Sequence, residues 1–187
     1  MERRTMDLLI RPFTREDFST LLEWVPDEAS LVQWAGTGLS FPIDAAQLEA
    51  IVAESTGERP RRLAWMATPA ASPAEAIGHF QIAYDRRCDT ATLARVILAP
   101  QARGRGLANS FVRLAVDEAF VDENVFRLEL NVYDFNTPAI RAYERVGFVQ
   151  EGVRRQSAPV GGERRNYPYL KDFHRDFYRA GLFGTAS

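Results

Sequence analysis

Residues 101–110 read QARGRGLANS and place two glycines, Gly104 and Gly106, among arginines. An apolar, strand-like segment (91–98) precedes this stretch, and a helix-like segment (108–122) follows it. The first N–H groups of a helix have no partner within the helix, and glycine lets the backbone come close to a bound anion. The stretch alone is equally compatible with an anion-binding loop and with a tight turn that carries arginines by chance. It is neither a Walker A motif nor a GxGxxG motif, because the required lysine and third glycine are absent.

The segments on either side of this loop predict a mixed sheet flanked by helices. Three strand-like segments follow one another before the loop, which is typical of an antiparallel meander. Helices and strands alternate after it, so we expect a mixed α/β or α+β sheet and not a doubly wound parallel one. The expected strands are 8–13, 63–68, 76–85, 91–98, 126–133, 147–156 and 172–183. The expected helices are 14–25, 28–35, 44–54, 108–122 and 137–147.

The composition predicts one ordinary soluble domain over residues 1–187, with 46% hydrophobic and 26% charged residues. A net charge of −2 argues against a broad nucleic-acid surface. The single cysteine, Cys88, excludes an intrachain disulfide, and the few Cys and His residues argue against a metal site. The sequence has no apolar run of about 18 residues, so we expect no membrane helix and a cytoplasmic location.

A second motif lies one strand and one helix after the glycine loop. The segment NVYDFNTPAIRAYERVGF (131–148) follows it with Asn136, Ala139, Tyr143 and Gly147 at fixed spacing. Together with Gln101, Gly104 and Gly106, this order resembles the GNAT superfamily of acyl-CoA-dependent N-acetyltransferases. The opening LLIRPFTREDF resembles in particular the branch of ribosomal-protein N-terminal acetyltransferases. The resemblance implies a mostly antiparallel central sheet, with a splayed parallel strand pair around the cofactor.

The resemblance also implies acetyl-CoA as cosubstrate and assigns residues to it. Backbone groups near Ile97 and Leu98 would meet the pantetheine arm, and Asn136 would contact the cofactor or fix its loop. Tyr143 would be the general acid for the leaving thiolate, although a helix residue packing through its ring fits the same spacing. The cradle for the pyrophosphate would comprise Arg103, Gly104, Arg105, Gly106, Leu107 and Ala108.

The general base is the point where this sequence departs from the family pattern. Some N-terminal acetyltransferases of the family carry a glutamate where this chain has Asn131. Glu129 lies two residues earlier and shares a strand face with Asn131 by alternation. Glu129 is a candidate base acting through an ordered water. The sequence is equally compatible with a strand carboxylate that only faces solvent. Asn131 is then a candidate acceptor-binding residue.

The acceptor is expected to be a primary amine, either a peptide N-terminus or a small molecule. Trp34 and Phe41, near the Gly-flanked loop 36–42, are candidates for the wall of its pocket. The basic and aromatic stretch 154–179 is more typical of a surface hairpin or a homodimer edge than of a nucleic-acid site. The alternative function is a GNAT-like module that binds acyl-CoA without turnover.

Overall fold

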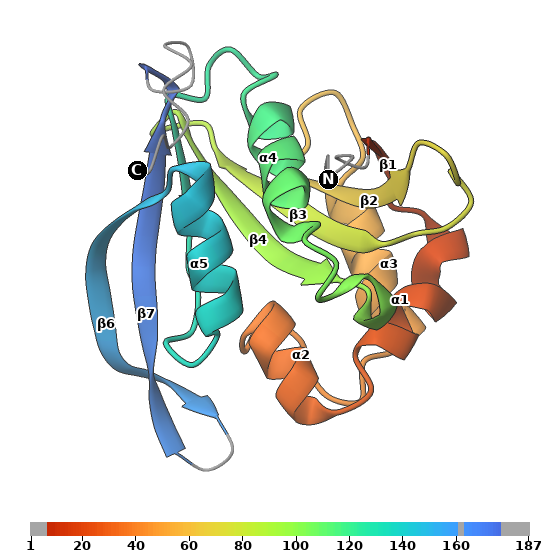
Figure 1. Ribbon diagram of the computed structural model, residues 1–187, viewed down its shortest axis with the longest axis horizontal. Coiled ribbons are helices and arrows are strands. Elements are labelled where there is room, and N and C mark those ends of the chain that lie inside the picture. Colours follow the sequence, from red (N-terminus) through yellow and green to blue (C-terminus); the bar gives the residue numbers. More distant parts are fainter. Residues whose placement is uncertain (1–6, 161–162, 177–187) are drawn as a thin grey trace, which may run out of the picture.

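The computed structural model describes residues 7–160 and 163–176, which form a seven-stranded sheet in the order β1-β2-β3-β4-β5-β7-β6 (Figure 1). Neighbouring strands are antiparallel except β4 and β5, which are parallel. This confirms the expected mixed, mostly antiparallel sheet. The strands are β1 (Leu8–Pro12), β2 (Arg62–Pro69), β3 (Gly78–Asp85), β4 (Thr90–Leu98), β5 (Arg127–Leu130), β6 (Val149–Val160) and β7 (Glu163–His174).

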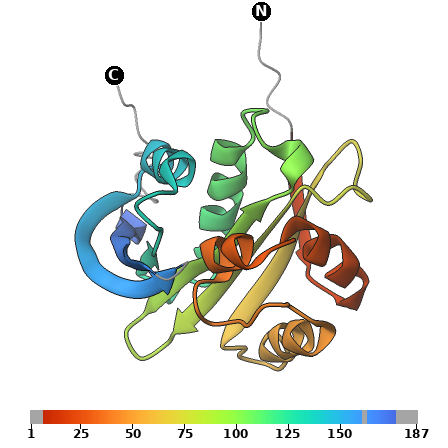
Figure 2. The ribbon, with the colours of Figure 1, turned by 90° about the horizontal axis from the view of Figure 1, so that it is seen from below.

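Helices cover both faces of the sheet. Helices α4 and α5 lie together on one face, and α3 packs on the other against β2 (Figure 2). Helix α2 packs against β4. The α-helices are α1 (Phe18–Trp24), α2 (Glu28–Ala35), α3 (Ala45–Glu54), α4 (Ala108–Ala119) and α5 (Thr137–Val146), and short 3-10 turns occupy Arg15–Asp17 and Pro100–Ala102.

Local capping explains where several of these helices begin and end. The Asp27 and Asp44 carboxylates accept backbone N–H groups at the starts of α2 and α3, at 2.7 and 2.9 Å. The backbone N–H of Thr14 donates to Asp17 at 2.9 Å, as expected for a helix start at this point. Helix α5 ends at Gly147 in the left-handed conformation.

Strands β4 and β5 separate part-way along their length. Their pairing runs from Thr90 opposite Arg127 to Leu93 opposite Leu130, whereas β4 continues to Leu98. Just beyond this point β4 contains a bulge, because the register with β3 shifts between His79 and Gln81. Such a bulge bends the strand and increases its twist. The splayed parallel pair expected at the cofactor cleft is therefore present.

Several strand boundaries differ from those expected: β6 extends to Val160 instead of 156, and the bounds of β5 and β7 follow from their pairing. The strand expected at 126–133 ends at Leu130, because pairing with β4 stops there and the next residues leave the sheet. The last strand was expected at 172–183, but β7 begins at Glu163, opposite Val160 of β6. It therefore starts nine residues earlier than expected, and residues 177–187 lie outside the described part of the chain.

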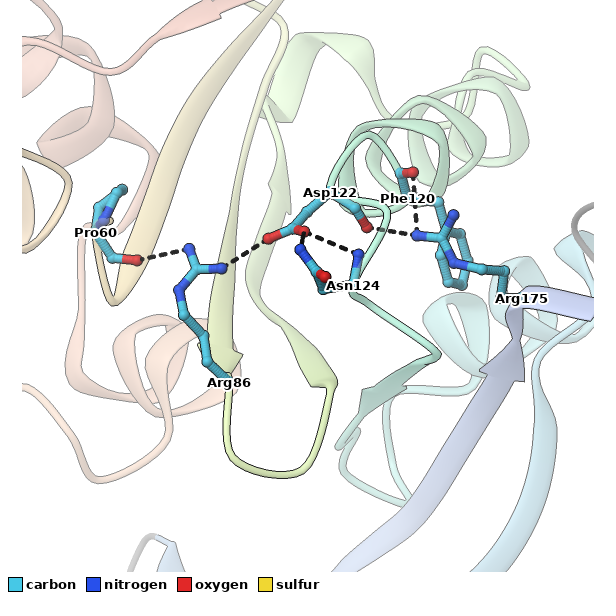
Figure 3. A network of polar contacts seen from close by, with 6 residues as sticks. All are labelled: Pro60, Arg86, Phe120, Asp122, Asn124 and Arg175. Carbon is cyan, nitrogen blue, oxygen red and sulfur yellow. Dashed lines mark hydrogen bonds and ion pairs between the residues drawn. The ribbon is translucent and has the colours of Figure 1, made fainter. Parts of the chain in front are cut away.

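Arg175 ties the end of β7 to the end of α4 (Figure 3). Its buried guanidinium lies 5.1 Å from the centre of the Phe120 ring and donates to the backbone carbonyls of Phe120, Asp122 and Val125. Carbonyl groups at a helix C-terminus lack helical partners and attract cations. The Asp122 carboxylate pairs with Arg86 at 2.7 Å, which extends the connection to the turn between β3 and β4.

We expect Arg175→Met to lower the free energy of unfolding by about 3 kcal/mol, because buried carbonyls lose a charged donor. Urea unfolding followed by circular dichroism measures this loss. The matched control is Arg15→Met, which breaks an exposed 2.6 Å ion pair with Glu49 and should change stability by less than about 1 kcal/mol. Equal losses in the two variants would contradict the structural role of Arg175.

Candidate functional site

A cavity of about 200 Å³ opens where β4 and β5 stop pairing. Its described walls come from the end of α2, the middle of β4, the segment after β5, and Asn136 and Tyr143 at α5. A second cavity of about 80 Å³ shares part of this wall, including Trp34 and Asn136, and extends to Ile97 and Arg103. The two cavities follow the second half of β4 toward the glycine loop.

The glycine loop presents an uncapped helix end. Gly104 and Gly106 have φ values of +70° and +77°, in the left-handed region that side chains rarely adopt. Leu107 stands at the N-cap of α4, and within the described part of the chain no side-chain cap accepts a hydrogen bond at this helix start. Arg103 and Arg105 are exposed, and the Nε atom of Arg103 donates to the Leu98 carbonyl at 3.1 Å. Backbone and charge together therefore suit an anion at this end of the cavities.

Helix α5 places the tyrosine of the second motif in the larger cavity. Tyr143 lines it, is buried, and packs edge-on against Phe148 with ring centres 5.8 Å apart. Its hydroxyl makes no hydrogen bond to any described residue. Burial raises the pKa of the Tyr143 phenol above its usual value, so the group keeps its proton at neutral pH. Asn136 is the N-cap residue of α5 and lines both cavities.

Trp34, at the end of α2, fixes the bulge of β4. Its indole N–H donates to the Arg95 carbonyl at 2.6 Å. Arg95 has a φ of +50°, an uncommon conformation for a residue with a side chain. The bulge carries the Arg95 guanidinium to Gln81 on β3, whose amide oxygen accepts its Nη1 atom at 3.2 Å.

Gln81 joins two arginines to a buried histidine. The same amide oxygen accepts Nη1 of Arg62 at 3.2 Å, so the Gln81 nitrogen faces His79 Nε2 at 3.0 Å. This arrangement assigns the proton of neutral His79 to Nδ1, which has no partner among the described residues. Burial, aided by the charge of Arg95, lowers the pKa of His79 to about 3.

Sequence reasoning did not single out Arg62, Gln81 or Arg95. A signal was present, because Gln81 and Arg95 interrupt otherwise apolar strands. A polar side chain at a buried strand position needs a partner. The partners lie on three different strands, so their convergence is visible only in the fold.

The structure brings six of the sequence-predicted residues to the described walls of the two cavities, with Ile97 and Arg103 in the smaller one. Trp34, Asn131, Asn136 and Tyr143 line the larger one. Phe41 is 45% exposed and lies outside the described walls of both cavities.

Glu129 lies behind the wall of the larger cavity. The Thr92 hydroxyl, which lines the cavity, donates to Glu129 at 3.4 Å, and Arg127 is 3.6 Å from its other oxygen. Because β5 ends at Leu130, the strand alternation used to pair Glu129 with Asn131 does not extend to Asn131. Asn131 reaches the cavity, whereas Glu129 touches it through Thr92.

Residues 7–149 match the family described as acetyltransferase (GNAT) domain. The chain belongs to the GNAT acetyltransferase family. The matched region runs from β1 through the glycine loop to the end of α5, and it contains every described residue that lines the two cavities of this GNAT domain.

Curated relatives align with parts of this GNAT chain. The spermidine N(1)-acetyltransferase of Escherichia coli (strain K12) is 35% identical over 72 residues, which are 38% of this chain and 39% of that protein. The probable N-acetyltransferase YjcK of Bacillus subtilis (strain 168) is 28% identical over 111 residues, 53% of this chain and 61% of that protein. The chain thus matches less than two thirds of the length of each of these relatives.

A solved GNAT structure shares the fold over almost its whole length. The crystal structure of spermidine N-acetyltransferase from Vibrio cholerae in complex with CoA and spermine has a TM-score of 0.77. The match covers 92% of this chain and 98% of that chain at 20% sequence identity. The finer resemblance to ribosomal-protein N-terminal acetyltransferases stays a prediction.

The described residues also bear on a membrane segment and on a metal site. No helix among them has the length and apolar character needed to cross a membrane. In the same part of the chain, no three His, Cys, Asp or Glu side chains come together as a possible metal site.

We expect the stability of the protein to fall as pH drops from about 6.5, because of His79. The histidine of the unfolded chain takes up a proton below that pH, whereas folded His79 stays neutral to about pH 3. The free energy of unfolding should then decrease by about 1.4 kcal/mol per pH unit.

Urea unfolding of wild type and His79→Gln between pH 7 and 4.5 tests this expectation, in a range where most carboxylates remain ionised. The variant should show a shallower slope even if it is less stable overall. Parallel slopes would show that His79 is not held neutral.

Proposed function

We propose that the protein is an acetyl-CoA-dependent N-acetyltransferase that acetylates a primary amine, either a small molecule or a peptide N-terminus. The observation that carries this proposal is the conjunction of an uncapped glycine-loop helix end with a buried, protonated tyrosine in the cavity where β4 and β5 stop pairing. Family membership supports it. In the reaction an amide N–C bond forms as the C–S bond of the thioester breaks, while the amine loses a proton and the sulfur gains one.

The residues present fit acetyl-CoA as cosubstrate, which supplies the activated acetyl group. The free N–H groups at the start of α4, the left-handed backbone of Gly104 and Gly106, and the exposed Arg103 and Arg105 suit a pyrophosphate. Leu107 and Ala108 complete this cradle. Ile97 and Leu98 would line the approach with backbone groups, and Asn136 would hold the loop between the two cavities.

Tyr143 is proposed as the general acid. Its buried phenol keeps its proton at neutral pH, and its hydroxyl is available to a ligand in the cavity. A positioned donor at the leaving atom accelerates such a transfer because the charge that develops there is neutralised. Trp34 and Asn131 would position the amine. Phe41, outside the described cavity walls, would contact the acceptor from the exposed loop.

Glu129 is proposed to receive the proton of the amine indirectly. Its carboxylate accepts the Thr92 hydroxyl, which lines the cavity, so a relay through Thr92 or a water reaches the amine without direct contact. No covalent enzyme intermediate is required, because the amine attacks the acetyl carbon directly.

A non-catalytic acyl-CoA-binding module is the alternative function. The indirect placement of Glu129 favours it, and the buried, protonated Tyr143 in the cavity favours the enzyme. Replacing Tyr143 separates the two, because only an enzyme has a rate to lose.

We expect Tyr143→Phe to lower kcat at least about 100-fold and to leave the Kd for acetyl-CoA within about twofold, because a general acid contributes 10²–10⁴ to the rate. Free-thiol release with a panel of amines measures the rate, and calorimetry measures Kd. The matched control is Tyr84→Phe, a half-buried tyrosine beneath Arg86 and outside both cavities. An unchanged kcat in the Tyr143 variant would remove the proposed acid.

We expect Gly106→Ala to raise the Kd for CoA about tenfold or more, because alanine disfavours the left-handed backbone that aims the loop. Calorimetry with CoA tests this without turnover. The matched control is Gly57→Ala, whose φ of +99° imposes similar strain in a loop away from the cavities. Both variants should lose similar stability, and equal CoA affinities would contradict the proposed cradle.

A further inference from the structure

The described wall of the larger cavity carries positive charge. Its charged residues are Arg62 and Arg95, and none of the described residues that line it is acidic. Buried or half-buried charges in proteins are normally paired. These two guanidinium groups are therefore expected to have anionic partners.

The two arginines are not equally compensated. Arg62 pairs with the Glu54 carboxylate, with Nε and the oxygen 2.7 Å apart. Arg95 reaches the neutral Gln81 amide and forms no salt bridge within the described part of the chain. Burial, and then the nearby Arg62 charge, lower the pKa of Arg95 to about 10, so it remains protonated at neutral pH. Glu54 also attracts Arg95 at longer range, but one carboxylate cannot neutralise two guanidinium groups, so the arginine pair keeps one positive charge without a counter-charge.

The backbone geometry of β4 determines where the Arg95 side chain lies. Gln81 faces Ala94 in the register, so regular alternation would send the next residue, Arg95, to the opposite face of the sheet. The bulge and the positive φ turn it back to the Gln81 side. Trp34 holds the Arg95 carbonyl in this conformation. A strained backbone that aims a charged side chain into a cavity is typical of functional sites.

This charge is separate from the cofactor loop. Gln81, on which both guanidinium groups converge, is level with Ala94, and β4 ends four residues later at Leu98. At the rise of a strand this is about 13 Å, and the glycine loop lies beyond it. The anion-binding helix end and the arginine pair therefore stand at different ends of the combined cavities.

We propose that Arg95, with Arg62 beside it, binds a carboxylate of the acceptor, so that the substrate is an amine that also carries a carboxylate and not a polycation. This inference rests on the proposed acetyltransferase function. A guanidinium fork matches a carboxylate with two parallel hydrogen bonds. A monoanion balances the one uncompensated charge, because Glu54 already neutralises Arg62.

The test compares matched acceptors with wild type, Arg95→Gln and Arg62→Gln. The acceptors are α-amino acids and ω-amino acids of increasing length, each with its carboxamide, together with spermidine. We expect wild type to favour the carboxylate member of a pair at least about tenfold in kcat/KM. Each variant should lower kcat/KM for the carboxylate about 10- to 100-fold, because a hydrogen bond to a charged group is lost. The kcat/KM for the matching carboxamide should stay within about twofold of the wild-type value.

The control variant is Arg61→Gln, at the exposed neighbour of Arg62 that does not line the cavity. Thermal unfolding of all variants identifies any that fail to fold. If Arg95→Gln does not fold, Arg62→Gln tests the proposal in its place. A preference for spermidine or for the carboxamides overturns the proposal. So does a loss that Arg61→Gln shares or that affects both members of a pair equally.

A binding measurement keeps this inference distinct from the proposed function. Calorimetry with the N-acetyl derivatives of the same acids and amides, in the presence of CoA, needs no turnover. If no amine is acetylated, the proposed function fails, yet Arg95-dependent binding of the N-acetyl acids still supports the carboxylate site. Absence of such binding overturns it, whatever the turnover.

Discussion

The end of pairing between β4 and β5 is the constraint on which the site depends. Parallel hydrogen bonding stops after Leu93 and Leu130, and the bulge at Arg95 then turns β4 away. If the two strands stayed paired to Leu98, their backbone groups would satisfy each other and the cavity would close. The separation opens both cavities, lets the segment after β5 line the larger one, and aims Arg95 inward. One departure from regular strand geometry thus creates the space and also supplies its charge.

The surrounding structure holds this departure in place. Trp34 arrives from α2 and binds the bulged carbonyl, while its ring packs against His79 with centres 5.7 Å apart. His79 contacts Gln81, which binds both arginines. A left-handed residue with a side chain persists only where its neighbours over-determine it. The N-terminal helices therefore stabilise the geometry of β4 as well as covering the sheet.

Sequence reasoning was strong where a signal is local. The helix boundaries at Thr14, Asp44 and Gly147, the three-strand meander and the glycine loop are each encoded in a few adjacent residues, and all are present in the fold. It was weaker where pairing partners decide the outcome. The length of β5 depends on where β4 bulges, and the start of β7 depends on its register with β6. The convergence of Arg62 and Arg95 on Gln81 was not predictable, because it needs β2, β3 and β4 in register and a reversal of the facing of Arg95.

The two ends of the combined cavities differ in whether backbone or side chains form them. The helix end that suits a pyrophosphate is made of backbone, so it can persist while side chains vary. The proposed acceptor end carries its charge on side chains of β2 and β4, so single substitutions there change that charge. A polyamine brought against Arg62 and Arg95 would meet like charge in a partly dehydrated cavity, where repulsion is far stronger than in water. Similarity in fold to a spermidine acetyltransferase therefore does not carry its acceptor with it, and the charge on the cavity wall is the better guide to the substrate.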